Sequence, residues 1–455
     1  MTFTDYVFDR FRWVFCQLDA LRHCLPIAIR QTLSELPKTL DETYQRVLNE
    51  IRMVDRGLAH RLLQCLTMAI RPLRVEELAE ILVLDFKVAN GATPTLNEEC
   101  RSENPQEDVL SICSSLIMVA DSGRSRVIQF SHFSVKEFLT SDRLATFQGD
   151  ISQAYVGDEP AHTTLALACL GTLVRLDGSL GNLQVDHKFP FAKYASQHWV
   201  EHAQFGKVSS QIEDGMQRLF DSTRPYFATW LRLYDMDDHW DQFGNSWATC
   251  GSTLYYASLF GFRDLAAHII KDHPEQVNAK GGRNHCPLAA ALYKGHFHVA
   301  DLLLQHGASI NVTGHHNQTP LQAASVDGLS DVARWLLDHG ADTHSQRDDH
   351  AAPIHLATAN GHLEVIKTLL EHNVYIDSVD KGGKTPLHHA SFSGRVEIVR
   401  LLLDHGANAN AVDKNGWTSL DLATTSEVVR LLLDHGASLD EERRSTEGGI
   451  ENGKV

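Results

Sequence analysis

The sequence lacks three features that define large classes of proteins. Its eight cysteines (16, 24, 65, 100, 113, 169, 250 and 286) include no C-x-x-C pair and no regular spacing. We therefore expect reduced, mostly buried thiols rather than a disulfide framework. Residues 1–5 lack the charged and apolar parts of a signal peptide, and the longest apolar stretch, 165–174, is too short to cross a bilayer. These absences predict a cytoplasmic protein that is neither secreted nor inserted in a membrane.

Basic charge and catalytic motifs are scarce as well. The formal net charge is −17, which works against binding a phosphate backbone. No G-x-S-x-G, H-E-x-x-H or Cys/His catalytic grouping is present. Among the 26 histidines, the pairs at 296 and 298 and at 315 and 316 lack a Cys or carboxylate partner at ligand spacing. We expect no enzyme activity, no metal site and no cofactor.

A ladder of prolines is the main feature that is present. Proline recurs at positions 287, 320, 353 and 386, and Ser419 continues the series, so that each step is 33 residues. A fixed period in this range is typical of stacked supersecondary units, and 33 residues is the length of an ankyrin repeat. In the clearest unit, 385–388 (Thr-Pro-Leu-His) opens a first helix and 401–403 (Leu-Leu-Leu) fills a second. The period therefore predicts a solenoid of helix pairs.

Glycine and histidine hold fixed places in these units. Glycines at 295, 328, 361 and 394 lie eight residues after each proline, where the chain must turn between antiparallel helices. Glycines at 307, 340, 406 and 436 are predicted to end the second helix in the left-handed conformation, and Asn373 takes this place once. Histidines at 306, 339, 372, 405 and 435 fall in the last turn of that helix, where a donor suits the carbonyl end. His355 and His388 are predicted to form hydrogen bonds between repeats.

The two ends of the array depart from the pattern. Thr253, with Gly261 eight residues later, marks a first repeat that is one residue longer than the others. At the other end, 428–433 follows Ala423 so closely that the last repeat is three residues short and has lost its mid-unit glycine turn. We expect six units over 247–440, with atypical ends because the terminal units cap a shared core.

The first half of the chain predicts helices followed by one hairpin. Thr39 and Glu42 form a capping box, and Ser134 and Glu137 form a second one that restarts a helix. The apolar spacing predicts helices over 40–51, 58–69, 75–82 and 109–115, an exposed loop over 90–106, and strands over 116–120 and 127–130 joined by a turn over 121–125. Three helices followed by a β-hairpin is the layout of a winged helix.

Winged helices often bind DNA, but the charges of this one argue against it. Residues 57–145 contain nine Lys and Arg against twelve Asp and Glu. The helix that would enter a groove, 108–118, contains no basic residue. Groove reading needs Arg or Lys at phosphates and base edges. We therefore expect no nucleic-acid partner.

Several segments of the chain resemble one family. Residues 36–44, 71–79 and 130–139 are similar to the stretch after the nucleotide-binding core in fungal NACHT–ankyrin proteins, which are signalling NTPases related to NOD-like receptors. Residues 11–18 resemble the end of the helical segment before the winged helix, and 191–199 and 230–235 resemble the helical linker before the repeats. Together with the period, this implies a mainly α chain: the helical segment over 1–56, a winged helix with a small β-hairpin over 57–145, a helical linker over 146–246, the ankyrin solenoid over 247–440 and a disordered tail over 441–455.

The resemblance also implies a nucleotide-binding core that these residues do not include. The Walker A loop of the family would precede residue 1. The candidate phosphate loop at 382–385 has Ser378 where the first glycine is needed, and it lies in a repeat turn. In the wider family a winged-helix histidine approaches the phosphates of bound ADP, and His132 is the matching position. The alternative is a hydrogen-bonded histidine that packs the wing against the next helix.

The surface available for recognition follows from the repeat geometry. Stacked units present a concave face made of turn tips and first helices, whose side chains have no core role. Counted from each proline, these positions give the candidate binding residues His285, Tyr293, Lys294, His316, Gln318, Asp349, Lys384, Phe392 and Trp417. Exposed aromatic residues dominate interface energetics, which singles out three of them unless neighbouring repeats shield the rings.

Two hypotheses for the chain follow, both with a protein partner and without a membrane partner. The first is a non-enzymatic recognition module whose ankyrin face binds a protein, as in the sensor part of a NACHT-type receptor. The second is the C-terminal part of a nucleotide-dependent signalling NTPase, for non-self recognition or programmed cell death, whose gene model was cut short. A reading frame upstream of Met1 that encodes G-x-x-x-x-G-K-[ST] would favour the second.

Overall fold

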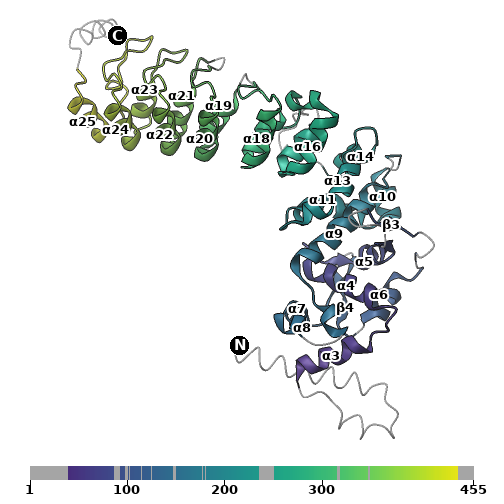
Figure 1. The fold of residues 1–455 in the computed structure, drawn as a ribbon. Helices are drawn as coiled ribbons and strands as arrows, with labels where there is room; N and C mark the ends of the chain where they lie inside the picture. Colours follow the sequence, from purple (N-terminus) through teal and green to yellow (C-terminus); the bar gives the residue numbers. More distant parts are fainter. Residues whose placement is uncertain are drawn as a thin grey trace, which may run out of the picture. The chain divides into compact units, whose positions relative to one another are not determined.

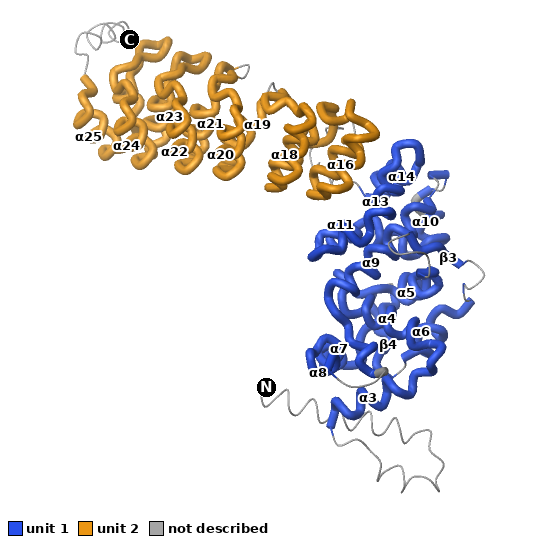
Figure 2. Tube along the Cα trace, viewed as in Figure 1, with its two compact units in different colours: residues 1–244 blue, residues 245–455 orange. Residues whose placement is uncertain are grey.

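The computed structural model describes residues 39–86, 93–97, 101, 103–113, 115–123, 125–146, 150–176, 178, 179, 181–234, 251–314, 318–346 and 349–438. The chain divides into two compact units, residues 1–244 and 245–455 (Figure 2). The chain is mainly helical, with small antiparallel sheets in the first unit and helix pairs in the second, which confirms the predicted fold class. The predictions for 11–18 and the tail 441–455 lie outside the described residues.

The winged-helix part has the predicted order of three helices and a hairpin (Figure 1). Its elements are α4 (Arg56–Met68), β1 (Leu73–Arg74), α5 (Val75–Leu82), α6 (Pro105–Cys113), β4 (Ile117–Ser122) and β5 (Ser125–Phe130). Strand β5 lies between β1 and β4 in an antiparallel sheet, with Leu73 opposite Ile128. The sequence analysis missed β1, because two residues are too few to show a strand period.

Three predicted boundaries in this part are wrong. Helix α6 begins at Pro105 and ends at Cys113, earlier than the predicted 109–115. The predicted loop 90–106 contains β3 (Thr95–Leu96), which pairs with β2 (Leu84–Asp85). The hairpin turn is tighter than 121–125, because the paired strands reach Ser122 and Ser125, and Gly123 adopts a φ of 62°. Cross-strand pairing of these polar residues extends the hairpin beyond its apolar run.

The second predicted capping box is also wrong. Helix α7 (Phe133–Leu139) begins after His132, not after Ser134. His132 has extended backbone angles, and its Nδ1 accepts a hydrogen bond from Ser134 N at 3.3 Å. The capping oxygen of Thr39 is confirmed, because it accepts from Glu42 N at the start of α3 (Leu40–Glu50).

The linker is helical as predicted. After α8 (Asp142–Thr146) and the 3₁₀ turn η2 (Asp150–Ala154) come α9 (Asp158–Leu173), α10 (Asn182–Lys188), α11 (Ala192–Ala203), α12 (Val208–Gln211), α13 (Glu213–Leu219) and α14 (Tyr226–Leu233). Trp199 and Trp230 are fully buried with ring centroids 5.4 Å apart, and Trp230 Nε1 donates to Ser196 O at 3.0 Å. Helix α9 packs against both α4 and α11, so the winged helix and the linker share one core.

A buried polar chain joins the same two parts. The Tyr194 hydroxyl accepts from Ile70 N at 3.1 Å and lies 2.8 Å from His202 Nε2. The His202 Nδ1 lies 2.8 Å from the Nδ1 atom of His162. Burial, with a smaller effect of the neighbouring histidines, lowers the pKa of His202 to about 3. The imidazole is therefore held neutral inside the first unit.

The second unit consists of helix pairs that we number as repeats. Repeat 1 is α15 (Thr253–Phe260) and α16 (Arg263–Asp272), followed by η4 (Pro274–Asn278); repeat 2 is α17 (Pro287–Tyr293) and α18 (Phe297–Gln305); repeat 3 is α19 (Pro320–Asp327) and α20 (Ser330–Asp338); repeat 4 is α21 (Pro353–Asn360) and α22 (Leu363–Glu371); repeat 5 is α23 (Pro386–Phe392) and α24 (Val396–Asp404); repeat 6 contains α25 (Ser426–Asp434). All eight predicted left-handed glycines have φ between 65° and 86°, and Asn373 has a φ of 56°.

Repeat 6 differs from the prediction in one respect. Ser419 continues the proline series, but it lies in a turn, and no first helix forms there. Thr418 N still donates to Asp421 Oδ2 at 2.9 Å, as a capping pair would. Without the mid-unit glycine turn, too few residues separate this pair from α25 for a full helix.

The predicted roles of the repeat histidines are confirmed where bonds are observed. His339, His405 and His435 place Nδ1 within 2.9 Å of the carbonyl oxygen four residues earlier. The four described cysteines (Cys65, Cys113, Cys169 and Cys286) are buried and form no disulfide, and burial raises the pKa of Cys65 and Cys113 to about 12. Within the described ranges, none of the helices is both long enough and apolar enough to cross a membrane.

Candidate protein-binding surface

The turn tips of the later repeats are built around buried or half-buried aspartates. Asp380 Oδ1 accepts from Gly382 N at 2.8 Å and from Lys384 N at 2.9 Å. Asp413 Oδ1 repeats the arrangement one unit later, with Trp417 N at 3.0 Å. Burial alone would raise the pKa of both carboxyls, but these hydrogen bonds lower each pKa below its usual value. The tips are therefore fixed by internal charge-assisted bonds.

Backbone bonds also join one tip to the next. Lys381 N donates to Asp349 O at 2.9 Å, and Lys414 N donates to Gly382 O at 3.0 Å. The amide groups of the candidate phosphate loop at 382–385 are thus used by Asp380 and by the tip itself. This arrangement leaves the loop as a repeat turn rather than a phosphate cradle, and it fixes the backbone beneath the surface side chains.

The three aromatic candidates are exposed rather than shielded. Tyr293, Phe392 and Trp417 are 44%, 62% and 48% exposed. Lys294 Nζ lies 5.7 Å from the Tyr293 ring centroid, and Lys384 Nζ lies 6.0 Å from that of Phe392. The Trp417 backbone is held at both its N–H and its carbonyl, while the ring remains at the surface. Rings on a rigid backbone lose little conformational freedom when a partner binds.

The structure groups only some of the predicted site residues. His285, Tyr293, Lys294 and Gln318 line one cleft of about 700 Å³ between α17 and α19. Lys384 and Phe392 lie together in repeat 5, Trp417 lies at the next tip, and Asp349 is exposed at the tip of repeat 4, where its carboxylate accepts from Ala351 N. His316 lies outside the described residues.

Sequence reasoning missed other exposed side chains. Tyr375, Val379 and Val412 are 69%, 48% and 47% exposed. The two valines stand 33 residues apart, each directly before a turn aspartate, so the period itself carried the signal. Tyr375 has no counterpart at that period, and its ring packs 4.5 Å from that of His344.

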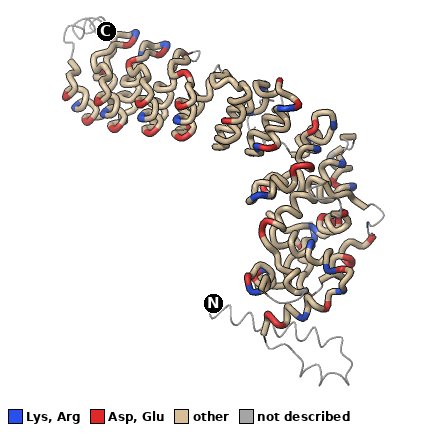
Figure 3. The backbone as a smooth tube through the Cα atoms, viewed as in Figure 1, with Lys and Arg blue, Asp and Glu red and all other residues tan. Residues whose placement is uncertain are grey.

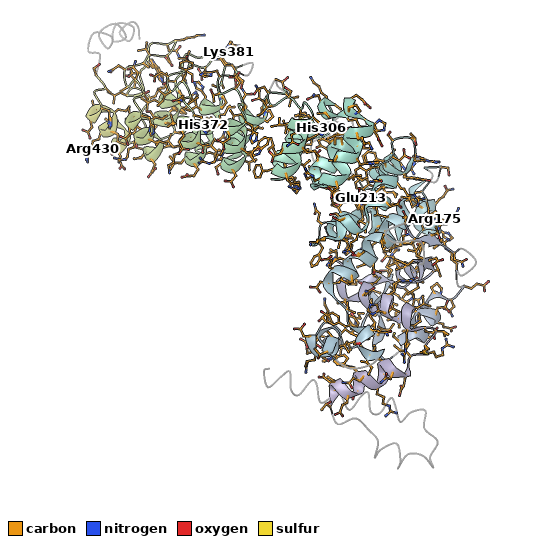
Figure 4. The ribbon with its side chains drawn as sticks, viewed as in Figure 1. Arg175, Glu213, His306, His372, Lys381 and Arg430 are labelled. Carbon is orange, nitrogen blue, oxygen red and sulfur yellow. The ribbon has the colours of Figure 1, made fainter. Side chains whose placement is uncertain are left out.

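The ends of the second helices form a different, acidic edge (Figure 3). Its last helical residues include Asp338, Glu371, Asp404 and Asp434. Two of these aspartates contact a histidine of the next repeat: Asp338 lies 3.5 Å from His372, and Asp404 lies 3.5 Å from His435. Figure 4 marks Lys381 at the turn-tip side and Arg430 on α25. Because the acidic edge bonds within the array, the turn tips and first helices are the better candidates for a partner.

His132 has the contacts of the structural alternative. Its Nδ1 lies 2.6 Å from Ser134 Oγ, which is 2.8 Å from the Tyr44 hydroxyl, and its ring lies 4.2 Å from that of Phe133. The histidine therefore caps α7 and links it to α3, while its nucleotide role stays a prediction. Among the described residues, no group of three His, Cys, Asp or Glu side chains is close enough to hold a metal ion.

Comparisons with known proteins agree with this architecture. The family described as "GPI inositol-deacylase, winged helix domain" matches residues 44–150, and "Ankyrin repeats (3 copies)" matches 254–347, 331–413 and 354–443. The azaphilone pigments biosynthesis cluster protein L of Monascus ruber is 33% identical over 293 residues, which is 60% of this chain and 60% of that relative. The chain thus spans about three fifths of the length of the relative it matches. It carries a winged-helix domain of the GPI inositol-deacylase type followed by ankyrin repeats.

Proposed function

We propose that this chain is a non-enzymatic recognition module whose ankyrin face binds a protein partner. The exposure of Tyr293, Phe392 and Trp417 carries the proposal, because the repeat pattern leaves these positions out of the core. Large rings beside a lysine, on a rigid backbone, are typical of residues that dominate interface energies. The ankyrin repeats support a protein as the partner.

Capture from an extract of the native organism tests this proposal. The full chain is compared with the triple variant Tyr293→Ala, Phe392→Ala, Trp417→Ala. Tyr375→Ala is the matched control, because it removes an exposed ring outside the predicted positions. We expect the same proteins on the wild type and the control, and their loss from the triple variant. Equal capture by the triple variant would contradict the proposal.

We further propose that the recognition module acts as the sensor part of a NACHT-type signalling receptor, inside the cell. The winged-helix type, which occurs in fungal NACHT proteins, supports this role, as does the order of winged helix, helical linker and repeats. Helix α6 carries Glu107 and Asp108 in its first turn and no Lys or Arg, so the charge of this helix favours a structural role over groove binding.

A second candidate is the C-terminal part of a nucleotide-dependent signalling NTPase. The position of His132 at the start of α7 favours it, because that is the histidine matched by the family resemblance. Titration of the purified chain with ADP and ATP by calorimetry separates the two candidates. The recognition module predicts no heat of binding up to millimolar nucleotide, whereas saturable binding that His132→Ala removes would favour the second.

A further inference from the structure

Each junction between repeats is bridged by the third residue of a first helix. Tyr255 of repeat 1 accepts from Asn284 N at 3.2 Å, and His388 of repeat 5 donates to Trp417 O at 3.1 Å. In repeats 3 and 4, the matching residues Gln322 and His355 donate to Ser345 O and Ser378 O, both at 2.8 Å. In these four repeats the bridge ties a first helix to the turn tip of the following repeat.

Repeat 2 lacks this bridge. Its third position is Ala289, whose methyl group cannot form a hydrogen bond. The carbonyl that matches Ser345 O and Ser378 O belongs to Val312, which lines the cleft between α17 and α19. That carbonyl therefore receives no donor from the third residue of the preceding repeat.

A second series of bridges fails at the same junction. The residue after each mid-unit glycine reaches back to a first-helix carbonyl: His362 lies 2.8 Å from Val326 O, and Arg395 donates to Ala359 O at 2.9 Å. His296 bonds in the same way to the backbone of Leu259. The matching residue of repeat 3 is Leu329, which has no donor for the Tyr293 carbonyl.

The space confirms the missing contacts. A methyl group added to Gly261, Gly328 or Gly361 would overlap a side chain of the following repeat, whereas nothing lies within 4 Å of one added to Gly295. Repeats 2 and 3 are joined along their second helices instead. There Trp335 Nε1 donates to Asp301 Oδ1 at 3.2 Å, at a position where the neighbouring repeats have Leu or Thr. The junction is therefore held on one side and open on the first-helix side.

The open side has an apolar floor and a cationic rim. The floor contains Leu292, Val326, Leu329 and Val332, and the rim contains Arg283, His285 and Lys294 against one carboxylate, Asp327. The rim is positive although the chain carries a net charge of −17. A volume of about 700 Å³ exceeds a single side chain and suits a few residues of an extended chain.

We propose that this cleft is the specificity site of the array and takes an extended acidic peptide segment of the partner. An apolar side chain of the segment fills the floor, and a neighbouring Asp or Glu meets Lys294. Main-chain N–H groups of the segment supply the donors that Ala289 and Leu329 do not supply to the Val312 and Tyr293 carbonyls. The proposal rests on the proposed function, and it adds the chemistry of the partner segment.

A random 12-residue peptide library displayed on phage tests the proposal with the full chain as target. Enriched peptides are synthesised and titrated by fluorescence anisotropy. The double variant Ala289→His, Leu329→His restores both bridges and closes the cleft, and we expect its thermal unfolding midpoint to rise. Lys294→Glu reverses an exposed rim charge without touching the core, and Lys271→Glu on α16 is its matched control.

We expect peptides with Asp or Glu beside Leu, Ile or Phe. Their affinity should fall at least tenfold with Lys294→Glu and with the double variant, and stay unchanged with Lys271→Glu. Peptides that bind all variants equally, peptides without acidic residues, or no enrichment at all would overturn the proposal. Peptides that depend on Phe392 and Trp417 but not on the cleft would overturn it while leaving the proposed function intact.

Discussion

Buried charge characterises the first unit, and exposed aromatic rings characterise the second. Glu77 is 0% exposed and accepts bonds from Arg71 and Arg74, and Glu80 is 5% exposed and accepts from Phe191 N. In the second unit the Phe392 ring is 62% exposed, over a backbone that hydrogen bonds hold in place. The first unit uses its polar groups to join its own helices, and the second leaves side chains available for a partner.

The same contrast separates the junctions within the second unit. Repeats 3, 4 and 5 are bonded to each other through the first helices and the turn tips. Repeats 2 and 3 lack both kinds of bridge and enclose the cleft. The comparison indicates that recognition lies where internal bonds are absent, because a side chain that joins two repeats is not available to a partner.

The largest expected effect is the loss of Glu77. Burial alone would raise the pKa of this carboxyl, but the bonds and charges of Arg71 and Arg74 lower it below its usual value. Glu77→Ala should lower the unfolding free energy of the first unit by about 3 kcal/mol, because it breaks a buried ion pair from one side. Urea denaturation followed by circular dichroism measures the change. Glu107→Ala, an exposed carboxylate, is the control, and a loss below about 1 kcal/mol for Glu77→Ala would contradict the account.

The next effect concerns the bridges of the array. His388 is 0% exposed, with Nδ1 accepting from Thr385 N at 3.1 Å and Nε2 donating to Trp417 O. His388→Ala should cost about 2 to 3 kcal/mol, because a buried N–H and a carbonyl lose their partner. The exposed His405→Ala should cost less than about 0.5 kcal/mol. Thermal unfolding of both variants compares them, and equal losses would show that the bridges do not hold the repeats together.

Acid should weaken the first unit through His202. The folded-state pKa is about 3 and the unfolded value is near 6.5, so the unfolded chain binds the proton first as the pH falls. The stability due to neutral His202 is complete above about pH 6.5 and is lost by about 1.4 kcal/mol per pH unit toward pH 3. Urea midpoints between pH 7 and 4.5 measure the slope. A His202→Gln variant should have a shallower slope, and an identical slope would assign the acid sensitivity to other groups.

The smallest expected change in stability comes from the exposed rings. Phe392→Ala and Trp417→Ala should change the unfolding free energy by less than about 1 kcal/mol, since neither ring lies in the core. Each should weaken binding of the captured partner by about tenfold, equivalent to about 1.4 kcal/mol. Thermal unfolding and partner titration test the pair of results. A large loss of stability would show that the rings are structural.

The repeats could be predicted in detail from the sequence because 33-residue spacing records each turn several times. Proline starts, left-handed glycines and the bridging histidines His355 and His388 were all readable from that record. The open junction was not, although Ala289 and Leu329 interrupt the same columns. Their meaning depends on bonds between repeats, which a list of positions does not show.

The first unit was less readable because it has no repetition. Strand β1 is too short for a period, and His132 replaced Ser134 as the cap of α7. The chain from Tyr194 through His202 to His162 joins residues up to 40 positions apart, so no local pattern reveals it. Of the candidate residues, the aromatic ones were found because tip positions carry no core role, while Val379 and Val412 lie one step outside those positions.

Hydrogen exchange of the full chain, with and without its captured partner, tests the central claim most directly. The account predicts that binding slows exchange at the turn tips and the first helices α17, α19, α21 and α23. It also predicts no change at the second helices or in the first unit. Protection confined to the acidic edge, or to the winged-helix domain, would contradict the claim that the ankyrin face is the recognition surface.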